Sequence, residues 1–538
     1  MSGLAACPQI APKKNGWSFA MRVLLINSNR KGDMLAAAPI GLCYVASAVE
    51  AAGHTVKALD LCFSRKRVFD EVELAIRSFE PEVIGVSVRN IDNTNMLHPI
   101  SYIPDTLELF EKIRRLIDCP IVVGGSAVSL APEAVLKLLK ADYVVVSDGE
   151  GPFTTLLECI GNGKEVVKIP GVGRLVNGVF DLTPPVMNGF VSRAPDIGRW
   201  VDTSSYRRIG AAYNIQTKRG CRRQCVYCTY NQSLEGVRLR LRDPIDVVDE
   251  IEDALKKYSP DTFEFVDSVF NDPIDHSVSI LEEIIRRPWK ARFTAMGVHP
   301  KGLDKGYLDL MWKAGFRSLM ITPESASDIM LANYRKGFTS KDVFEAAEAL
   351  NKTAFAVWWF FMIGGPGETN ETLQTSLDFV LNNLKKDGRA VTHVAQFFIG
   401  VRLYPRTGLW KLAIKEGFVN RLTNPLDQVW YMSEELDLDE AVSQMFHAAA
   451  VCPEIYLGFD EKMLSFSRVI AGICRLLRLK GPYWKYMRFG NVIGIKTGIR
   501  FIFKPADAAG SIRKALVSQS YSGRLVKRFA EPLPVAHG

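Results

Sequence analysis

Three cysteines stand close together in the stretch KRGCRRQCVYCTY. They are Cys221, Cys225 and Cys228, spaced C-x3-C-x2-C, with the aromatic residue Tyr227 directly before the third. Three thiolates can hold three irons of a 4Fe-4S cube. Because no fourth cysteine stands nearby, one iron would be left to bind a ligand that is not protein. This spacing therefore predicts redox chemistry at an open iron.

A zinc site, a disulfide framework and ordinary packing are the alternatives. Zinc sites usually show two separated ligand pairs, which this stretch lacks. Disulfide frameworks suit short secreted chains, and the opening residues, MSGLAACPQIAPKKNGW, contain no apolar signal core. We expect the other seven cysteines (7, 43, 62, 119, 159, 452 and 474) to be reduced packing residues. Four basic residues around the first ligand should favour thiolates: Lys218, Arg219, Arg222 and Arg223.

The cysteine motif with its preceding aromatic residue resembles the signature of radical S-adenosylmethionine (SAM) enzymes, and the resemblance continues in order to about Val401. It implies that the amino and carboxylate groups of SAM chelate the free iron. An electron from the cluster, supplied by a donor such as flavodoxin or ferredoxin, then cleaves SAM to methionine and a 5'-deoxyadenosyl radical. The protein's share is binding, orientation and exclusion of side reactions.

Length and composition predict a large cytoplasmic enzyme of several domains. The 538 residues exceed what one hydrophobic core normally serves. The longest apolar run, 354–363, is far shorter than the ~20 residues of a membrane-spanning helix. We expect an N-terminal extension (1–20), a Rossmann-like domain (21–160), a Gly-, Pro- and Val-rich linker (161–205), a radical SAM domain (206–435) and a mostly helical C-terminal region (436–538).

Short apolar runs alternate with helical patterns in the first domain. Strands are expected at 21–29, 55–61, 82–88, 119–125 and 141–147, with helices at 40–53, 104–117 and 131–140. This α/β alternation predicts a doubly wound parallel sheet, whose ligands sit beyond the carboxyl ends of the strands. The loops at that edge are 27–34, 89–95, 124–129 and 148–151.

None of these loops is a dinucleotide fingerprint or a Walker loop. A Rossmann-like domain before a radical SAM core instead resembles the cobalamin-binding domain of cobalamin-dependent radical SAM enzymes. The segments PIGLCYVASAVEAAGH, VVGGSAVSLAPE and VSDGEGPF carry this resemblance. An empty structural domain is the alternative. The cobalamin contacts that the resemblance implies are Arg89, Asn90, Gly124, Gly125, Ser126, Ser129, Gly149 and Glu150.

The D-x-H-x-x-G motif that supplies a histidine to cobalt in other cobalamin proteins is absent. We therefore expect no protein histidine beneath the metal. Arg89 or Asn90 would face the cobalt from below, where a cation cannot ligate and would help to stabilise Co(I). The alternative is that Arg89 forms a salt bridge with Asp92.

The second domain alternates strand and helix again. Strands are expected at 214–220, 262–270, 291–298, 318–325, 354–365 and 393–405, and helices at 244–258, 277–287 and 309–315. Six such units predict a partial barrel of the TIM type, with the cluster and SAM at the carboxyl ends of its strands.

Several strand ends carry groups that suit SAM. The resemblance places Asp267 at the SAM amine, and Glu324 and Ser325 at the ribose and carboxylate. It places Gly364, Gly365 and Gly367 in a turn that lets the backbone approach adenosine. Tyr227 and residues 399–401 are expected adenine contacts. Helix capping and tight turns are the structural alternatives. His299 and His393 are expected to pack or to form hydrogen bonds.

The C-terminal region contains a basic stretch, 462–504, with ten Lys or Arg and no Asp or Glu, in a chain whose net charge is +8. Three interpretations stay open: peripheral contact with an anionic membrane, a site for an anionic substrate or partner, and a packed helix with a solvated basic face. Nucleic acid binding is not expected, because no recognition motif accompanies the charge.

The resemblance implies a methyltransferase that uses a 4Fe-4S cluster, SAM and cobalamin to methylate a carbon of a small-molecule or lipid-like substrate. Polar methylation of an aromatic carbon, or a radical cyclisation or rearrangement, is the alternative within the family. A non-catalytic iron-sulfur protein with a redox or partner-binding role is the alternative of another class.

Overall fold

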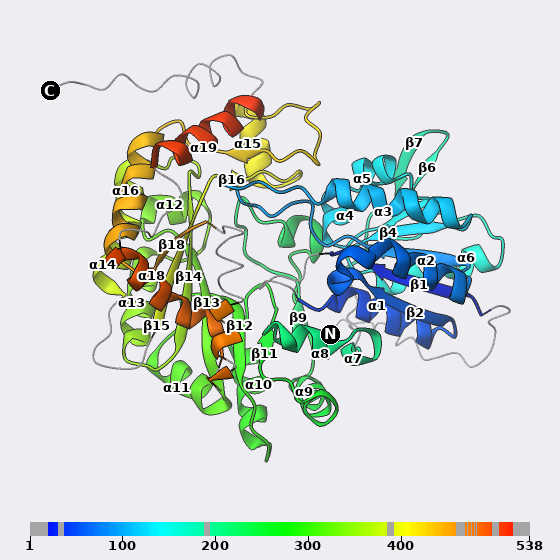
Figure 1. The fold of residues 1–538 in the computed structure, drawn as a ribbon, viewed down its shortest axis with the longest axis horizontal. Helices are drawn as coiled ribbons and strands as arrows, with labels where there is room; N and C mark the ends of the chain where they lie inside the picture. Colours follow the sequence, from blue (N-terminus) through cyan, green and yellow to red (C-terminus); the bar gives the residue numbers. More distant parts are fainter. Residues whose placement is uncertain are drawn as a thin grey trace, which may run out of the picture.

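A computed structural model describes residues 20–30, 37–187, 194–384, 392–458, 469–497 (without 471, 475, 478 and 480) and 505–519. Residues 31–34 of the first expected ligand loop, and positions 462–468 and 498–504 of the basic stretch, lie outside this set. Figure 1 shows two α/β sheets side by side, one built from the first third of the chain and one from the remainder.

The first sheet has the strand order β2-β1-β3-β4-β5-β6-β7, and its first five strands run parallel. This confirms the expected doubly wound arrangement. Its strands are β1 (Arg22–Asn27), β2 (Thr55–Asp60), β3 (Val83–Ser87), β4 (Ile121–Gly124), β5 (Tyr143–Val145), β6 (Val172–Val176) and β7 (Val179–Leu182). The helices are α1 (Ile40–Ala51), α2 (Val68–Phe79), α3 (Ile103–Leu116), α4 (Ser126–Leu130), α5 (Pro132–Leu139) and α6 (Glu150–Gly161), with the 3-10 turns η1 (Leu61–Phe63) and η2 (Arg65–Arg67).

The interval 161–205, expected to be a linker, contains ordered structure that belongs to the first sheet. Strands β6 and β7 form an antiparallel hairpin, and β6 pairs with β5. The alternation of residues in this hairpin is short and interrupted by Gly173 and Gly178, which explains why no periodic signal identifies it. Helices α7 (Ile197–Trp200) and α8 (Thr203–Arg208) then lead into the second domain.

The second sheet has seven parallel strands, β18-β15-β14-β13-β12-β11-β8. They are β8 (Tyr213–Ile215), β11 (Phe263–Phe265), β12 (Phe293–Val298), β13 (Phe316–Glu324), β14 (Ala356–Ile363), β15 (Thr392–Ile399) and β18 (Ile455–Leu457). Short pairs flank the sheet: β9 (Lys218–Arg219) with β10 (Arg240–Leu241), and β16 (Val401–Arg402) with β17 (Trp430–Tyr431). The first six strands match the expected βα units. The seventh, β18, comes from beyond residue 435, so the sheet continues into the region expected to be helical.

Helices connect the strands of this sheet. They are α9 (Pro244–Tyr258), α10 (Ile274–Arg286), α11 (Lys305–Ala314), α12 (Asp328–Asn333), α13 (Ser340–Asn351), α14 (Asn370–Asn383), α15 (Gly408–Glu416) and α16 (Leu438–Val451). Helix α9 shows how sequence sets such an element. Asp243 accepts a hydrogen bond from the backbone N–H of Ile245, Pro244 occupies the first turn, and Val247 and Ile251 are buried at helical spacing.

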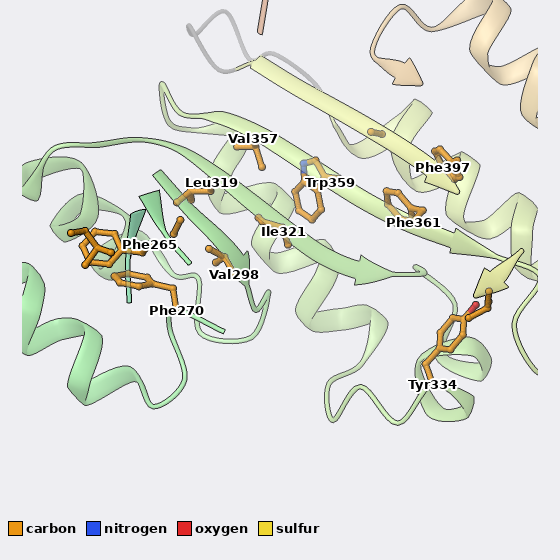
Figure 2. Packing of buried hydrophobic residues seen from close by; sticks show 14 of the residues in the cluster. Phe265, Phe270, Val298, Leu319, Ile321, Tyr334, Val357, Trp359, Phe361 and Phe397 are labelled. Carbon is orange, nitrogen blue, oxygen red and sulfur yellow. The ribbon is translucent and has the colours of Figure 1, made fainter. Parts of the chain in front are cut away.

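The main core lies between the second sheet and its helices. Figure 2 shows Val357, Trp359 and Phe361 of β14 lining one face of the strands, beside Phe397 of β15. Each of these side chains is at most 1% exposed. Burial of one such side chain is worth about 1.5–3 kcal/mol. Alternate residues of the same strands therefore point to the opposite face, which is the interior of the open barrel.

The C-terminal region adds η4 (Tyr483–Tyr486), α18 (Met487–Thr497) and α19 (Pro505–Gln519). Trp484 of η4 is buried against the inner face of the sheet, where its ring centroid lies 5.0 Å from that of Trp358. The end of the chain thus covers part of the barrel interior.

Candidate active site at the junction of the two domains

The cysteine loop follows β9, which belongs to the short strand pair beside the second sheet. Gly220, directly before Cys221, has a φ of +92°, and a Cβ built there would lie 2.1 Å from the carbonyl oxygen of Arg238. Only glycine fits this close approach without a shift of the backbone. The backbone N–H of Cys221 donates to the carbonyl oxygen of Gly236, 2.9 Å away. The loop therefore starts from a fixed position.

The three thiols lie on this loop within range of one another's charge. Cys221 is buried, and Cys225 and Cys228 are half-buried. Burial raises the pKa of the Cys221 thiol; burial, with Cys225 nearby, raises the pKa of Cys228 to about 12. Within the described part of the chain, no three His, Cys, Asp or Glu side chains converge on a single metal ion. A 4Fe-4S cube has a different requirement, because each thiolate binds a different iron.

The basic residues around Cys221 are engaged by protein groups, and among them Arg223 favours the Cys221 thiolate as expected. Arg222 and Arg223 both pair with Asp272. Lys218 donates to the carbonyl oxygen of Phe270, 2.7 Å away. Burial of the Cys221 thiol nevertheless raises its pKa against the opposite effect of Arg223. Iron binding would reverse this balance, because a metal-bound thiol is deprotonated.

Tyr227, Glu324 and Lys336 form a hydrogen-bonded group beside the cysteine loop. The Tyr227 hydroxyl donates to Glu324 Oε1 at 2.9 Å, and Lys336 Nζ lies 3.0 Å from the Tyr227 hydroxyl and 3.3 Å from Glu324 Oε1. Glu324, at the end of β13, has a φ of +69°, an unfavourable value for a residue with a side chain. Lys336 follows α12 and carries no sequence motif, so only the structure identifies it.

Asp267 is committed to the protein rather than free for a ligand. It is 3% exposed, and its Oδ1 accepts from the backbone N–H groups of Thr217 and Lys218. Its Oδ2 accepts from the Thr217 hydroxyl at 2.7 Å. These three bonds hold the segment between β8 and β9. The structure thus gives Asp267 a positioning role in place of the expected contact with the SAM amine.

Ser325 is also placed away from the expected site. It is fully buried, its hydroxyl lies 3.0 Å from that of Ser376 on α14, and it accepts from the backbone N–H of Ser327. The strand turns at Glu324, and this turn directs the next side chain into the helix-side core. Sequence proximity to Glu324 does not bring Ser325 to the same surface.

The glycine turn after β14 is held by a buried carboxylate. Glu368 Oε2 accepts from the N–H groups of Gly364 and Gly365, at 2.9 and 3.3 Å. Burial raises the pKa of Glu368 to about 8. A Cβ at Gly365 would lie 2.1 Å from the Tyr334 hydroxyl, so glycine is required here by a protein neighbour. This differs from the expected reason, which was access for adenosine.

Arg89 and Asn90 follow β3 and are exposed, and Arg89 is close enough for its charge to lower the pKa values of Glu264 and Tyr230 in the second domain. The alternative pairing of Arg89 with Asp92 is excluded. Asp92 instead binds Arg402 at 2.8 Å, with both side chains almost fully buried. Arg89 therefore places a positive charge near Glu264 and Tyr230 and is not paired with Asp92.

The other expected cobalamin contacts divide into two groups. Gly124, Gly125, Ser126 and Gly149 are exposed or half-buried at the same edge of the first sheet. Gly125 has a φ of +103°, and a Cβ there would lie 2.5 Å from the carbonyl oxygen of Val88. Ser129 is buried, and its hydroxyl donates to the carbonyl of Gly125 and accepts from the N–H of Ser147.

Glu150 is 7% exposed and pairs with Arg219 of the second domain, 2.6 Å away. It therefore joins the two domains through Oε1, a role that the sequence did not indicate. The sequence alone does not reveal this partner, because Arg219 stands 69 residues away from Glu150 and belongs to no motif shared with it.

Two large side chains remain uncovered where the domains meet. Tyr230, two residues after Cys228, is 41% exposed, and Met296 on the inner face of β12 is 45% exposed. Arg89 lies near Tyr230, and the backbone at Gly125 is exposed at the same edge of the first sheet. These residues fit a site for bulky cofactors: thiols on one side, and a flat glycine-containing edge with a cation on the other.

Comparison with known families assigns both domains. Residues 28–157 match the B12 binding domain, and residues 215–380 match the radical SAM superfamily. These matches confirm the resemblance that the sequence shows and its three cofactor classes: cobalamin, SAM and an iron-sulfur cluster. Among the described residues, no helix is both long enough and apolar enough to cross a membrane.

Individual relatives agree with this assignment. A tryptophan 2-C-methyltransferase of Streptomyces laurentii is 25% identical over 452 residues, covering 72% of this chain and 74% of the relative. An uncharacterized methyltransferase of Pyrococcus horikoshii is 26% identical over 385 residues, covering 70% and 78%. The radical SAM methyltransferase TsrM from Kitasatospora setae, solved with cobalamin and a [4Fe-4S] cluster, superimposes with a TM-score of 0.76 at 24% identity, covering 89% of this chain and 99% of that structure. This last similarity establishes the shared fold.

Proposed function

We propose that this chain, an enzyme that joins a B12-binding domain to a radical SAM domain, is a methyltransferase acting on a carbon of a small-molecule substrate. The observation that carries the proposal is the position of the cysteine loop. Its three thiols stand at the carboxyl edge of the second sheet, across from Arg89 at the carboxyl edge of the first. The two cofactor sites would therefore face each other.

The cluster and SAM supply reductive SAM cleavage when bound, and cobalamin supplies a methyl carrier. Cys221, Cys225 and Cys228 would hold the cluster. Tyr227 and Lys336 hold Glu324 through its Oε1, which leaves Oε2 to accept from a ribose hydroxyl of SAM. Glu368 keeps the turn at Gly364 rigid beside this position.

Arg89 and Asn90 would lie beneath the corrin, and Gly125 and Ser126 along its edge. The exposure of Arg89, and its freedom from Asp92, support this placement. A guanidinium beneath the corrin would favour an electron-rich metal without coordinating it. Replacement of Arg89 by Leu should leave cobalamin bound but slow the return to its reduced state, which absorption spectroscopy would follow.

The test is anaerobic reconstitution with iron, sulfide and a cobalamin, followed by SAM and a strong reductant. Mass spectrometry of SAM products and the cobalamin absorption spectrum are recorded together. Retained cobalamin that becomes methylated, and loss of all SAM turnover after Cys→Ala changes at 221, 225 and 228, are the expected results. SAM turnover by the triple variant, or a protein that binds no cobalamin, would overturn the proposal.

Product analysis separates the alternatives. Methylated product with an equivalent of 5'-deoxyadenosine supports radical methylation, and methylated product without it supports polar transfer to an aromatic carbon. Deoxyadenosine with a substrate-derived product that has gained no methyl group supports cyclisation or rearrangement. A cluster without any SAM cleavage would support a non-catalytic iron-sulfur protein. A flavodoxin or ferredoxin is the proposed electron donor.

We also propose that the C-terminal region contacts an anionic membrane surface. Four apolar side chains at helical spacing are exposed: Val469 (57%), Ile473 (51%), Leu476 (84%) and Leu477 (62%). They lie within the stretch of ten basic residues and no acidic ones. Co-sedimentation with phosphatidylglycerol vesicles, but not phosphatidylcholine vesicles, is expected. Asp at 476 and 477 should abolish it, whereas Leu422→Asp, at a loop residue that is 90% exposed, should not.

A further inference from the structure

The inner face of the second sheet carries a row of polar side chains at one level. Asn214 on β8 is the Cα partner of Glu264 on β11, which in turn pairs with Thr294 on β12. Their chain neighbours, such as Phe263 and Phe265, are fully buried on the helix side. Because side chains alternate along a strand, the three polar groups face the barrel interior together.

This row holds hydrogen-bond acceptors that the protein leaves unused. Asn214 donates from Nδ2 to Glu264 Oε2 at 3.2 Å, but the buried Asn214 Oδ1 has no partner. The buried hydroxyl of Thr294 also has none. Asn214 is 2% exposed and Thr294 is 6% exposed. Buried polar atoms are nearly always paired, so an unpaired amide oxygen and an unpaired hydroxyl on one face indicate a missing polar partner, and the amide oxygen requires a donor.

Glu264 is the charged member of the row. It is half-buried, and its bond to Asn214 uses only Oε2. No ion pair within 4.0 Å involves Glu264 among the described side chains, although Arg89 is near enough to influence it electrostatically. Burial raises the pKa of Glu264 to about 7, against the opposite effects of Arg89 and Asn214. A carboxylate in this position gains most from a cationic donor.

Farther around the same inner face, the lining changes from polar to apolar. Phe360 on β14 is half-buried and lies nearly parallel to Trp358, with centroids 5.4 Å apart, and to Phe398 on β15, at 6.3 Å. Half-buried Met320 is the Cα partner of Trp358. Trp484 covers the far side of Trp358. This wall suits a flat apolar group.

The polar row lies inside the barrel rather than at its rim. Glu264 precedes Asp267 by three residues, which is roughly 10 Å along an extended chain. Asp267 binds the segment that leads to the cysteine loop. A molecule held by the row and the apolar wall would therefore sit below the cysteine loop, with its upper end near the exposed side chain of Met296.

We propose that Glu264, with Asn214 and Thr294, binds an amine or another N–H donor of the substrate, and that Met320, Phe360 and Phe398 contact its flat apolar body. The substrate class is thus a planar apolar molecule with a protonated amine. This inference rests on the proposed function, since it takes the barrel interior to be the substrate site of that reaction.

Three probes that share one flat body test this directly: naphthylethylamine, naphthylacetate and ethylnaphthalene. Their affinities for the anaerobically reconstituted, cobalamin-loaded protein are measured by equilibrium dialysis without reductant. The amine is expected to bind about tenfold or more tightly than the hydrocarbon, as one charge-assisted hydrogen bond implies, and the carboxylate most weakly. Equal affinities for all three would overturn the inference without the need for any variant.

Variants then assign the effect to residues. Glu264→Gln should remove most of the preference for the amine while leaving the affinity for ethylnaphthalene unchanged. Phe360→Ala should weaken all three probes alike. Glu345→Gln, at an exposed position on α13, is the matched control and should change nothing. An amine preference that survives in Glu264→Gln would contradict the assignment. Loss of cobalamin in the same variant would also contradict it, because that loss would indicate that Glu264 acts as a counter-charge to Arg89.

Measurements on the same preparations distinguish a failure of this inference from a failure of the proposed function. SAM cleavage and cobalamin methylation are measured in parallel. If both occur but the probes show no amine preference, only the substrate class is wrong. If neither occurs while the amine preference and its dependence on Glu264 hold, the binding site stands and the proposed function fails.

Discussion

The guanidinium of Arg219 lies 2.6 Å from the carboxylate of Glu150, and the two side chains, each 8% exposed, join the B12-binding domain to the strand that precedes Cys221. Asp148 extends the contact, because it binds both Arg219 and Arg240. Arg240 also donates to the carbonyl oxygen of Glu235. The loop expected to contact cobalamin and the loop that carries the cysteines thus share one buried charge network.

Loss of Arg219 should therefore disturb both cofactor sites. Arg219→Met leaves Glu150 buried without its partner, which typically costs about 3–5 kcal/mol. We expect lower thermal stability of the apo protein, and lower iron and cobalamin content after reconstitution. Arg22→Met is the control, because Arg22 and Glu82 form an exposed pair worth about 0–1 kcal/mol. Equal effects of the two changes would show that the network does not couple the domains.

The cysteine assignment predicts a selective loss of iron. Alanine at Cys221, Cys225 or Cys228 should remove most of the absorbance and iron of the reconstituted cluster and abolish SAM cleavage. Cys119→Ala, at a half-buried position outside the loop, should retain both. Full cluster content in any of the three single variants would exclude that cysteine as a ligand.

Glu324 and Ser325 are adjacent, but the structure predicts opposite consequences for them. Glu324→Ala should weaken SAM binding to the reconstituted protein by about tenfold, as expected for loss of a charged hydrogen-bond acceptor. Ser325→Ala should leave SAM affinity unchanged and cost about 1 kcal/mol of stability, because its hydroxyl bonds Ser376 inside the core. Equilibrium dialysis and thermal unfolding distinguish the two outcomes. A loss of SAM affinity in Ser325→Ala would favour the sequence-based placement.

Glu368 predicts a pH dependence of stability. Burial raises its pKa from 4.5 to about 8, so the folded protein binds a proton that the unfolded chain releases. The stability from this group is fully present below pH 4.5 and declines as the pH rises towards 8. The melting temperature should therefore fall between pH 6 and 8.5.

Glu368→Gln tests the cause of that slope. The amide cannot ionise but keeps an oxygen that accepts from the N–H groups of Gly364 and Gly365. The variant should melt at least as high as the wild type at pH 8.5 and show a flatter pH profile. Glu371→Gln, at an exposed position nearby, is the control. An unchanged slope in Glu368→Gln would assign the pH dependence to other buried carboxyls, such as Glu250.

Residues close together in the sequence determined much of the secondary structure and the cysteine motif of this protein. The cysteine motif, the parallel strands β1–β5, β8 and β11–β15, and helices such as α3 and α9 could be predicted, because each depends on residues a few positions apart. The hairpin β6–β7 and strand β18 could not be predicted. Their apolar runs are short, and they form strands because they pair with the edges of the two sheets, β6 with β5 and β18 with β15.

The tertiary structure decided which polar residues are free to act. Asp267, Ser325 and Glu150 have suitable chemistry and suitable positions in the chain, yet each is engaged by a partner between 2 and 69 residues away. Lys336 and the row of Asn214, Glu264 and Thr294 carry no motif, yet folding places Lys336 beside Glu324 and aligns the other three across neighbouring strands. A hydrogen bond depends on distance and direction in three dimensions, and folding alone sets both.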